Sequence, residues 1–155
     1  MAYKFETMTQ EQAEEIAFTW HYENKYSFYD LEADQEDLEE FLSQDKRGNS
    51  VFAVLEKDEL VAFLSVISVN PETVDIGLGM RPDLTGKGKG LDFLKEGIEF
   101  IQLTSKPKAI GLSVATFNER AIKVYRKLGF EDSGLFMQET NGSTFEFLKM
   151  IYRCE

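Results

Sequence analysis

The chain has 155 residues and a formal net charge of −11, with 43% hydrophobic and 13% aromatic residues. This length and apolar content predict one globular domain over residues 1–155, and the negative charge argues against nucleic acid as a partner. The sequence shows neither an apolar run of the roughly 18 residues needed for a membrane span nor a signal-peptide pattern at its start, so we expect no membrane association.

The first half of the chain predicts four strands and two helices. Thr9 is expected to cap the first helix, with Gln12 at the spacing of a capping box. Short turns at Lys57-Asp58 and Asn70-Pro71 should join three strands into an antiparallel meander. The expected strands cover 3–8, 50–56, 60–69 and 73–80, and the expected helices cover 11–20 and 35–42.

The second half predicts two more helices and three more strands. A long helix over 91–103 should carry the chain back over the sheet, with a buried stripe of Leu91, Leu94, Ile98 and Ile101. The strand over 109–116 should then lie parallel to the strand over 73–80. A hairpin of strands 131–139 and 144–152 turns at Asn141-Gly142. This order predicts an α/β sandwich, a mixed sheet covered by helices.

A glycine-rich corner joins the strand that ends at Met80 to the helix that begins at Leu91. Gly86, Gly88 and Gly90 remove the Cβ atoms that would keep a ligand away from the backbone. The first amides of the helix lack intrahelical partners and lie at the positive end of its dipole, which suits a pyrophosphate. The corner matches neither a Walker A loop nor the dinucleotide fingerprint, which would need glycine at position 91.

A second motif begins about thirty residues later at Asn118, which is expected to cap a helix. Apolar residues then recur at helical spacing, and Gly129 suits the end of the helix. Asn118 and Tyr125 lie seven positions apart, or two turns, so both side chains should project from one side of the helix.

The two motifs together, Thr85-Gly86-Lys87-Gly88-Lys89-Gly90 and the Ala-x-x-x-Tyr and Leu-Gly-Phe pattern after Asn118, resemble the GNAT superfamily of N-acetyltransferases. Their layout is most similar to the ribosomal-protein and polyamine acetyltransferase branch. The resemblance implies a three-layer α/β/α sandwich, with a splayed parallel strand pair at the acyl-CoA site. It also implies direct transfer of an acetyl group from acetyl-CoA to a primary amine in a ternary complex. Thr85 departs from the family pattern, which usually has Gln or Arg there.

The resemblance also assigns the binding of coenzyme A. Arg81, Lys87 and Lys89 should make the glycine corner locally basic, although the backbone amides should carry most of the binding. Asn118 either contacts the cofactor or only caps its helix. The implied cofactor-binding residues are Leu78, Gly79, Met80, Arg81, Thr85, Gly86, Lys87, Gly88, Lys89, Gly90, Leu91, Asn118 and Tyr125.

Two residues are candidates for the chemistry. The resemblance makes Tyr125 the general acid for the departing thiolate, whereas its spacing alone is also that of a core tyrosine with a satisfied hydroxyl. Asp75 alternates onto the same strand face as Gly77 and Gly79, which is the cleft face in relatives. It is either the base that deprotonates the amine or a solvent-facing or salt-bridged aspartate. Many relatives use a chain of water molecules instead. For Gly77 and Gly79, close approach of a ligand is the better explanation, because glycines inside a strand weaken its pairing, and simple turn or packing geometry is the alternative.

An aromatic-rich connection between the first two helices is the candidate acceptor site, because the family places this segment over the substrate mouth. Aromatic and acidic side chains there would suit a cation. For Trp20 and Phe28, burial in the core is the alternative. The candidate residues are Trp20, Tyr22, Tyr26, Phe28, Tyr29 and Asp30.

The single cysteine and the single histidine limit which disulfides and metal sites the chain can form. Cys154 cannot form an internal disulfide, which fits the cytoplasm. His21 belongs to no His/Cys cluster, so we expect no metal and place it near its helix end. The sequence leaves open a monomer or a homodimer. It also leaves open two other functions, a non-catalytic CoA-binding or regulatory module and an O-acyltransferase.

Overall fold

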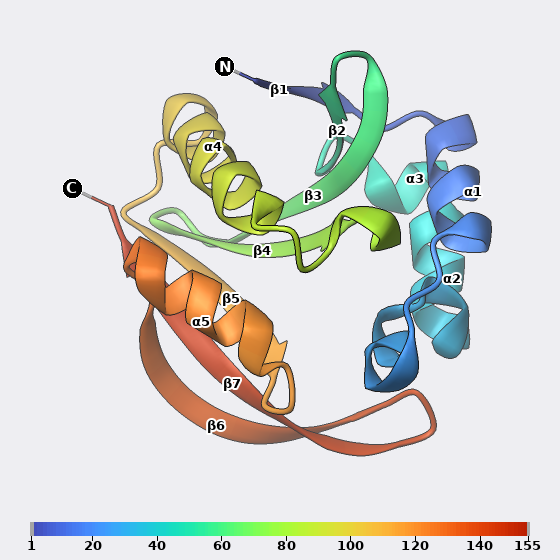
Figure 1. Cartoon of the computed structure of the whole chain (residues 1–155). Helices are drawn as coiled ribbons and strands as arrows, with labels where there is room; N and C mark the ends of the chain where they lie inside the picture. The colour runs from blue at the N-terminus through green and yellow to red at the C-terminus, as the bar shows by residue number, and fades with distance from the viewer. Residues whose placement is uncertain (1, 155) are drawn as a thin grey trace.

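One sheet of seven strands runs through the computed structural model, which describes residues 2–154 (Figure 1). The strands lie in the order β1-β2-β3-β4-β5-β7-β6. Every neighbouring pair is antiparallel except β4 and β5, which are parallel, so the predicted mixed sheet is confirmed. The strands are β1 Tyr3–Thr7, β2 Val51–Glu56, β3 Glu59–Asn70, β4 Thr73–Met80, β5 Ala109–Ala115, β6 Glu131–Thr140 and β7 Ser143–Arg153.

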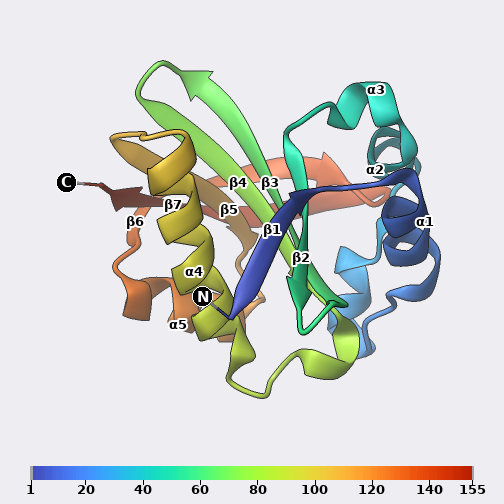
Figure 2. The ribbon, with the colours of Figure 1, turned by 90° about the horizontal axis from the view of Figure 1, so that it is seen from above.

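Helices cover both faces of this sheet and give the expected α/β/α sandwich. The view from above places α4 and α5 on one side and α1, α2 and α3 on the other (Figure 2). The connection between the first two helices forms two 3-10 helices, η1 and η2, which the sequence did not predict; α3 was also missed. The bounds are α1 Gln10–Thr19, η1 Asn24–Tyr29, η2 Leu31–Ala33, α2 Gln35–Leu42, α3 Gln44–Arg47, η3 Pro82–Leu84, α4 Lys89–Thr104 and α5 Glu119–Leu128. Within the described chain, no helix is long and apolar enough to cross a membrane.

Capping side chains start two of these helices as their spacing predicts. The amide of Gln12 donates to Thr9 Oγ1 (3.1 Å), and the amide of Thr9 donates to Gln12 Oε1 (2.9 Å), which completes the capping box before α1. Asn118 Oδ1 accepts from the amide of Ala121 (3.2 Å) at the start of α5. Gly129 ends α5 with φ 110°, a left-handed conformation that glycine adopts without strain.

The main core lies between the sheet and α4. Leu94, Ile98 and Ile101 of the predicted stripe are buried, whereas Leu91 is only partly buried and borders a cavity. Each fully buried side chain of this size contributes roughly 1.5–3 kcal/mol by leaving water. Their neighbours in the core include Val54, Leu64, Ile110, Leu112 and Met150. This packing fixes α4, and with it the glycine corner, over the middle of the sheet.

The parallel pair β4 and β5 separates partway along its length. The two strands pair only over 73–75 and 109–111, while β4 stays paired with β3 and β5 with β7. Beyond Asp75 and Gly111 the strands diverge, and the β4 amides that would face β5 have no strand to bond. We call this divergence the fork. It is the splayed pair that the family resemblance implied.

Candidate functional site

Two adjoining cavities meet at the fork. The first, the loop cavity, has a volume of about 170 Å³ and lies between the glycine corner, α4 and the start of α5. The second, the fork cavity, has a volume of about 300 Å³ and is lined by β4, β5, the start of α5 and three tyrosines of the segment 22–29. The residues that line both cavities are Leu78, Met80, Thr85, Asn118, Arg120, Ala121 and Tyr125.

The glycine corner presents bare backbone to the loop cavity. Gly86 and Gly88 have φ values of 74° and 78°, in the left-handed region that favours glycine. Gly88 is the N-cap of α4, and no side chain caps that helix. A Cβ at Gly88 or Gly90 would meet nothing within 4 Å, so the space beside the first helical amides is open. The arrangement is therefore a backbone anion site at a helix N-terminus.

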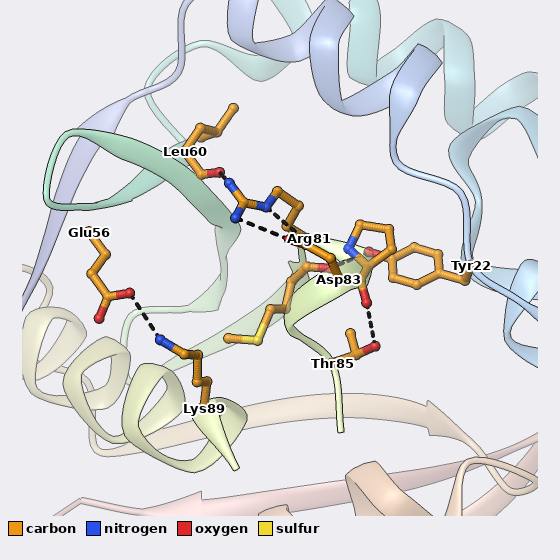
Figure 3. Close-up of polar contacts among 9 residues, drawn as sticks. Tyr22, Glu56, Leu60, Arg81, Asp83, Thr85 and Lys89 are labelled. Atoms are coloured by element: carbon orange, nitrogen blue, oxygen red, sulfur yellow. Dashed lines mark hydrogen bonds and ion pairs between the residues drawn. The ribbon is translucent and has the colours of Figure 1, made fainter. Parts of the chain in front are cut away.

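The basic side chains expected at this corner, Arg81, Lys87 and Lys89, line neither cavity. Arg81 Nε donates to Asp83 Oδ1 (2.7 Å), and Lys89 Nζ lies 3.4 Å from Glu56 Oε1 (Figure 3). Carboxylates thus already neutralise two of the three cations. Lys87 is exposed and borders neither cavity.

Thr85 lines both cavities but turns its hydroxyl inward. Thr85 Oγ1 donates to the carbonyl oxygen of Pro82 (2.7 Å), inside its own turn (Figure 3). The threonine that replaces the family's long polar side chain therefore stabilises the turn before the corner.

The cation that does line both cavities is Arg120, which sequence reasoning missed. Its guanidinium carbon lies 4.3 Å from the centre of the Tyr26 ring, within cation–π distance. Its Nη1 lies 3.4 Å from where a Cβ of Gly86 would be. Among residues 2–154 it forms no ion pair. Its place two residues after Asn118, on the first turn of α5, was the signal that could have identified it.

Asn118 and Tyr125 project from one side of α5 into both cavities, as predicted. Asn118 Nδ2 donates to the hydroxyl of Tyr29 (3.2 Å), so its side chain does more than cap the helix. The Tyr125 side chain is 9% exposed, and within residues 2–154 its hydroxyl has no hydrogen-bond partner. Burial raises the pKa of Tyr125 far above its ordinary value, with a smaller contribution from Tyr29. Tyr125 is therefore a protonated phenol that faces the fork.

Three tyrosines of the aromatic connection line the fork cavity: Tyr22, Tyr26 and Tyr29. The hydroxyl of Tyr22 donates to the carbonyl oxygen of Met80 (2.7 Å), which ties this connection to the end of β4 (Figure 3). Burial raises the pKa of both Tyr22 and Tyr29, so both phenols are protonated at neutral pH.

Trp20, Phe28 and Asp30 border neither cavity. Trp20 is buried in a second, smaller core and packs 6.4 Å from the ring of Phe63. Phe28 packs against other aromatic rings, of which Phe145 is 4.7 Å away. Core burial therefore holds for Trp20, whereas Phe28 is only partly buried and packs within a cluster of aromatic rings. The carboxylate of Asp30 lies within its own segment, where its Oδ1 accepts from the amide of Tyr22 (2.7 Å).

Asp75 also lies outside both cavities. Its Oδ1 lies 2.9 Å from Lys149 Nζ, so its carboxylate takes part in an ion pair. The lone histidine is placed as expected near its helix end, where His21 Nε2 lies 3.0 Å from the carbonyl oxygen of Phe18. In the described part of the chain, no three His, Cys, Asp or Glu side chains are arranged to hold a metal.

Gly77 and Gly79 border the fork cavity, but their neighbours already explain the absence of a side chain. A Cβ at Gly77 would lie 2.7 Å from Ser65 Oγ, and a Cβ at Gly79 would overlap the ring of Phe63. Packing against β3 therefore requires glycine at both positions. The prediction that ligand approach is the better explanation is not supported.

Solved structures with this fold cover nearly the whole chain. Spermidine N-acetyltransferase from Vibrio cholerae, in complex with CoA and spermine, has a TM-score of 0.77 at 18% identity over 98% of this chain and 95% of its own. A putative phosphinothricin N-acetyltransferase has a TM-score of 0.76 at 15% identity over 99% of both chains. An acetyltransferase (GNAT family) from Bacillus anthracis has a TM-score of 0.75 at 14% identity over 99% of this chain and 95% of its own.

Comparison by sequence gives the family. No curated protein matches the chain. The model of the acetyltransferase (GNAT) family matches residues 11–130, which include the glycine corner and the second motif. With the fork, the uncapped α4 and the Asn118–Tyr125 helix in place, the chain belongs to the acetyltransferase (GNAT) family.

Proposed function

We propose that the protein transfers an acetyl group from acetyl-CoA to a primary amine, by direct transfer in a ternary complex. The observation that carries this proposal is the fork and its two adjoining cavities: the uncapped N-terminus of α4 lines the loop cavity, and the buried phenol of Tyr125 lines both. Membership of the family supports acyl transfer. The donor, the acceptor and the roles of single residues are the proposal. We also propose a cytoplasmic location, which Cys154, as the only cysteine, supports.

The loop cavity suits coenzyme A. The amides at the start of α4 would bind its diphosphate, and the guanidinium of Arg120 beside Gly86 would add a positive charge. Apolar side chains would surround the uncharged pantetheine arm. They include Leu78, Leu91, Phe93, Leu94 and Val124. The thioester would then reach the fork, where the β4 amides lack strand partners.

The residues at the fork would promote the reaction in two ways. A β4 amide in the segment 78–80 would donate a hydrogen bond to the thioester oxygen as negative charge develops on it. The amine nitrogen bonds to the carbonyl carbon, the carbon–sulfur bond breaks, and Tyr125 donates its proton to the departing thiolate. Burial keeps Tyr125 protonated until that step. Solvent then restores the proton of the phenol.

The amine has to lose a proton before or during attack, and Asp75 remains our proposed base. It lies on the same strand face as Gly77 and Gly79, which border the fork cavity. Its carboxylate would receive the proton through water molecules, because Asp75 itself lies outside the cavity and contacts Lys149.

The direct test is calorimetric titration with coenzyme A, followed by an assay of thiol release from acetyl-CoA across a panel of amines and alcohols. We expect binding of CoA and release of thiol with at least one primary amine. Binding without turnover on any acceptor would identify a CoA-binding module instead. Turnover with alcohols alone would identify an O-acyltransferase, and no heat with CoA would contradict the assignment of the donor.

A further inference from the structure

We infer that the acceptor is a compact primary monoamine with an apolar or aromatic body, and that Arg120 excludes a second positive charge from the fork cavity. This inference rests on the proposed function, because it names the class of amine that the same site accepts.

The lining of the fork cavity offers nothing to neutralise a second ammonium. Within residues 2–154, no Asp or Glu borders it, and its one charged lining residue is the cation Arg120. The other lining groups are phenols, apolar side chains, small polar residues and glycines. A polyamine carries more than one ammonium at neutral pH. Each ammonium that leaves water without a carboxylate partner raises the cost of binding.

Three carboxylates of the segment 20–34 and of β4 already hold the surrounding structure. Asp30, Asp34 and Asp75 come from the acceptor segment and from β4, and each has partners of its own. Turning any of them toward a ligand would leave those partners unsatisfied. The partners are the amide of Tyr22 for Asp30, the amides of Glu36, Asp37 and Asn141 for Asp34, and Lys149 Nζ for Asp75.

Arg120 also occupies the aromatic surface that a cationic acceptor would use. Its guanidinium carbon lies 4.3 Å from the centre of the Tyr26 ring. The cation–π interaction that the aromatic segment can offer on that face is therefore made inside the protein. A second ammonium in the cavity would meet a like charge instead, and repulsion of this kind excludes a wrong partner. Binding of a diphosphate at the glycine corner would bring no carboxylate into the fork cavity.

The remaining space favours an uncharged acceptor body. The fork cavity as a whole has a volume of about 300 Å³, and its lining includes Phe63, Leu112, Val114, Tyr26 and Tyr29. Covering an apolar group with these surfaces would favour binding by roughly 25 cal/mol for each Å² of apolar area removed from water. An alkyl or aryl group next to the reacting amine would therefore contribute to binding, whereas a charged group in that place would not.

The test compares two pairs of acceptors: pentylamine with 1,5-diaminopentane, which are matched in chain length, and phenethylamine with spermidine, which contrast an aromatic body with further ammonium groups. The quantity measured is kcat/KM at saturating acetyl-CoA. We expect the wild-type protein to prefer each monoamine by about tenfold or more, the factor that corresponds to about 1.4 kcal/mol. Arg120→Gln should reduce this preference, and Arg120→Lys should retain it. A ratio taken within one variant cancels any effect of the substitution on the donor.

Lys123→Gln is the matched control, because it removes a positive charge from α5 at an exposed position that borders neither cavity. It should leave the preference unchanged. Equal or better use of the diamine or of spermidine by the wild-type protein would overturn the inference. An unchanged preference in Arg120→Gln would overturn the role of Arg120. Binding of CoA with no acetylation of any amine would instead overturn the proposed function, and this inference with it.

Discussion

The carboxylate of Asp75 on β4 and the ammonium of Lys149 on β7 lie 2.9 Å apart, although β5 runs between their strands. They can meet because Gly111 of β5 has no side chain. A Cβ there would lie 2.5 Å from Asp75 Oδ1 and 3.0 Å from Lys149 Nζ. Asp75 and Gly111 are also the last paired residues before β4 and β5 diverge. The ion pair therefore crosses over β5 at the point where the fork opens.

Gly111→Ala should disturb this pair and the reaction more than it disturbs the fold. The ends of Asp75 and Lys149 are flexible and 41% and 29% exposed, so they can move aside, and an ion pair so exposed contributes only about 0–1 kcal/mol to stability. We expect a kcat/KM several-fold below wild type with little change in Tm, measured by thiol release and thermal unfolding. A large fall in Tm with unchanged activity would show that Gly111 serves packing alone.

Asp75→Asn tests the proposed base while keeping the size of the side chain. General base catalysis contributes about 10²–10⁴-fold, so a loss of kcat/KM in this range is expected at a pH where the amine is protonated. The loss should shrink at higher pH, because more of the amine is then already neutral. Lys149→Met is the companion variant, since it removes the partner and leaves the carboxylate. Wild-type activity of Asp75→Asn on its preferred amine would assign deprotonation to water.

Tyr125→Phe removes the proposed proton donor. We expect kcat to fall about 10²-fold or more while the affinity for CoA, measured by calorimetry, stays near wild type. Burial raises the pKa of Tyr125 above its ordinary value. The phenol therefore stays protonated at every pH below this raised pKa and loses its proton only above it. Between about pH 6 and 9 the loss should therefore be independent of pH. Unchanged turnover across this range would remove the role of general acid.

The contact between Arg120 and Tyr26 predicts coupling between the glycine corner and the acceptor segment. Arg120→Met should weaken binding of CoA about tenfold at low salt and less at high salt, because a charged interaction is lost. Tyr26→Leu should weaken it by a smaller factor, since an exposed cation–π contact contributes about 0.5–1 kcal/mol, and Tyr26→Phe should not. In a double-mutant cycle the effects should not add. Acetyl-pantetheine, which has no diphosphate, should bind the wild-type protein and each of these variants alike.

Asp34 predicts an acid-sensitive contact beside the site. Its carboxylate caps α2 and accepts from the amide of Asn141, while Asn141 Nδ2 donates to the carbonyl oxygen of Phe28 (2.7 Å), so the β6–β7 turn is held against η1. The amide of Asn141, followed by that of Asp37, lowers the pKa of Asp34. The folded-state pKa therefore lies below the unfolded value of about 3.9. This stabilisation is present above the unfolded value and is lost as pH falls through the folded one.

Asp34→Ala should accordingly lower Tm at neutral pH. Asp34→Asn, which does not titrate, should lose less stability than wild type between about pH 5 and 3. Asp45→Asn is the control, because this carboxylate is exposed and makes no side-chain hydrogen bond among residues 2–154. Thermal unfolding at stepped pH measures all three variants. An equal acid dependence in wild type and Asp34→Asn would contradict the contact.

The sequence by itself determined the elements and the two motifs, because their signals are local. The bounds of β4 and α2 agree with prediction, and the caps Thr9 and Asn118 act as expected, since apolar period and capping depend on residues a few positions apart. Helical geometry alone places the side chains of Asn118 and Tyr125 on the same side of their helix. These signals were enough to predict the family, the glycine corner and the sheet order around it.

Only the tertiary structure decided which side chains face the fork. Lys89 with Glu56, Arg120 with Tyr26, and Asp75 with Lys149 join residues more than thirty positions apart, and no periodicity encodes such pairs. The two ion pairs neutralise charges near the site, whereas the cation–π contact holds the charge of Arg120 beside it. Such partners come together only after the strands and helices have packed. The sequence thus set the scaffold and the glycine corner, while packing set which charged side chain lines the fork cavity.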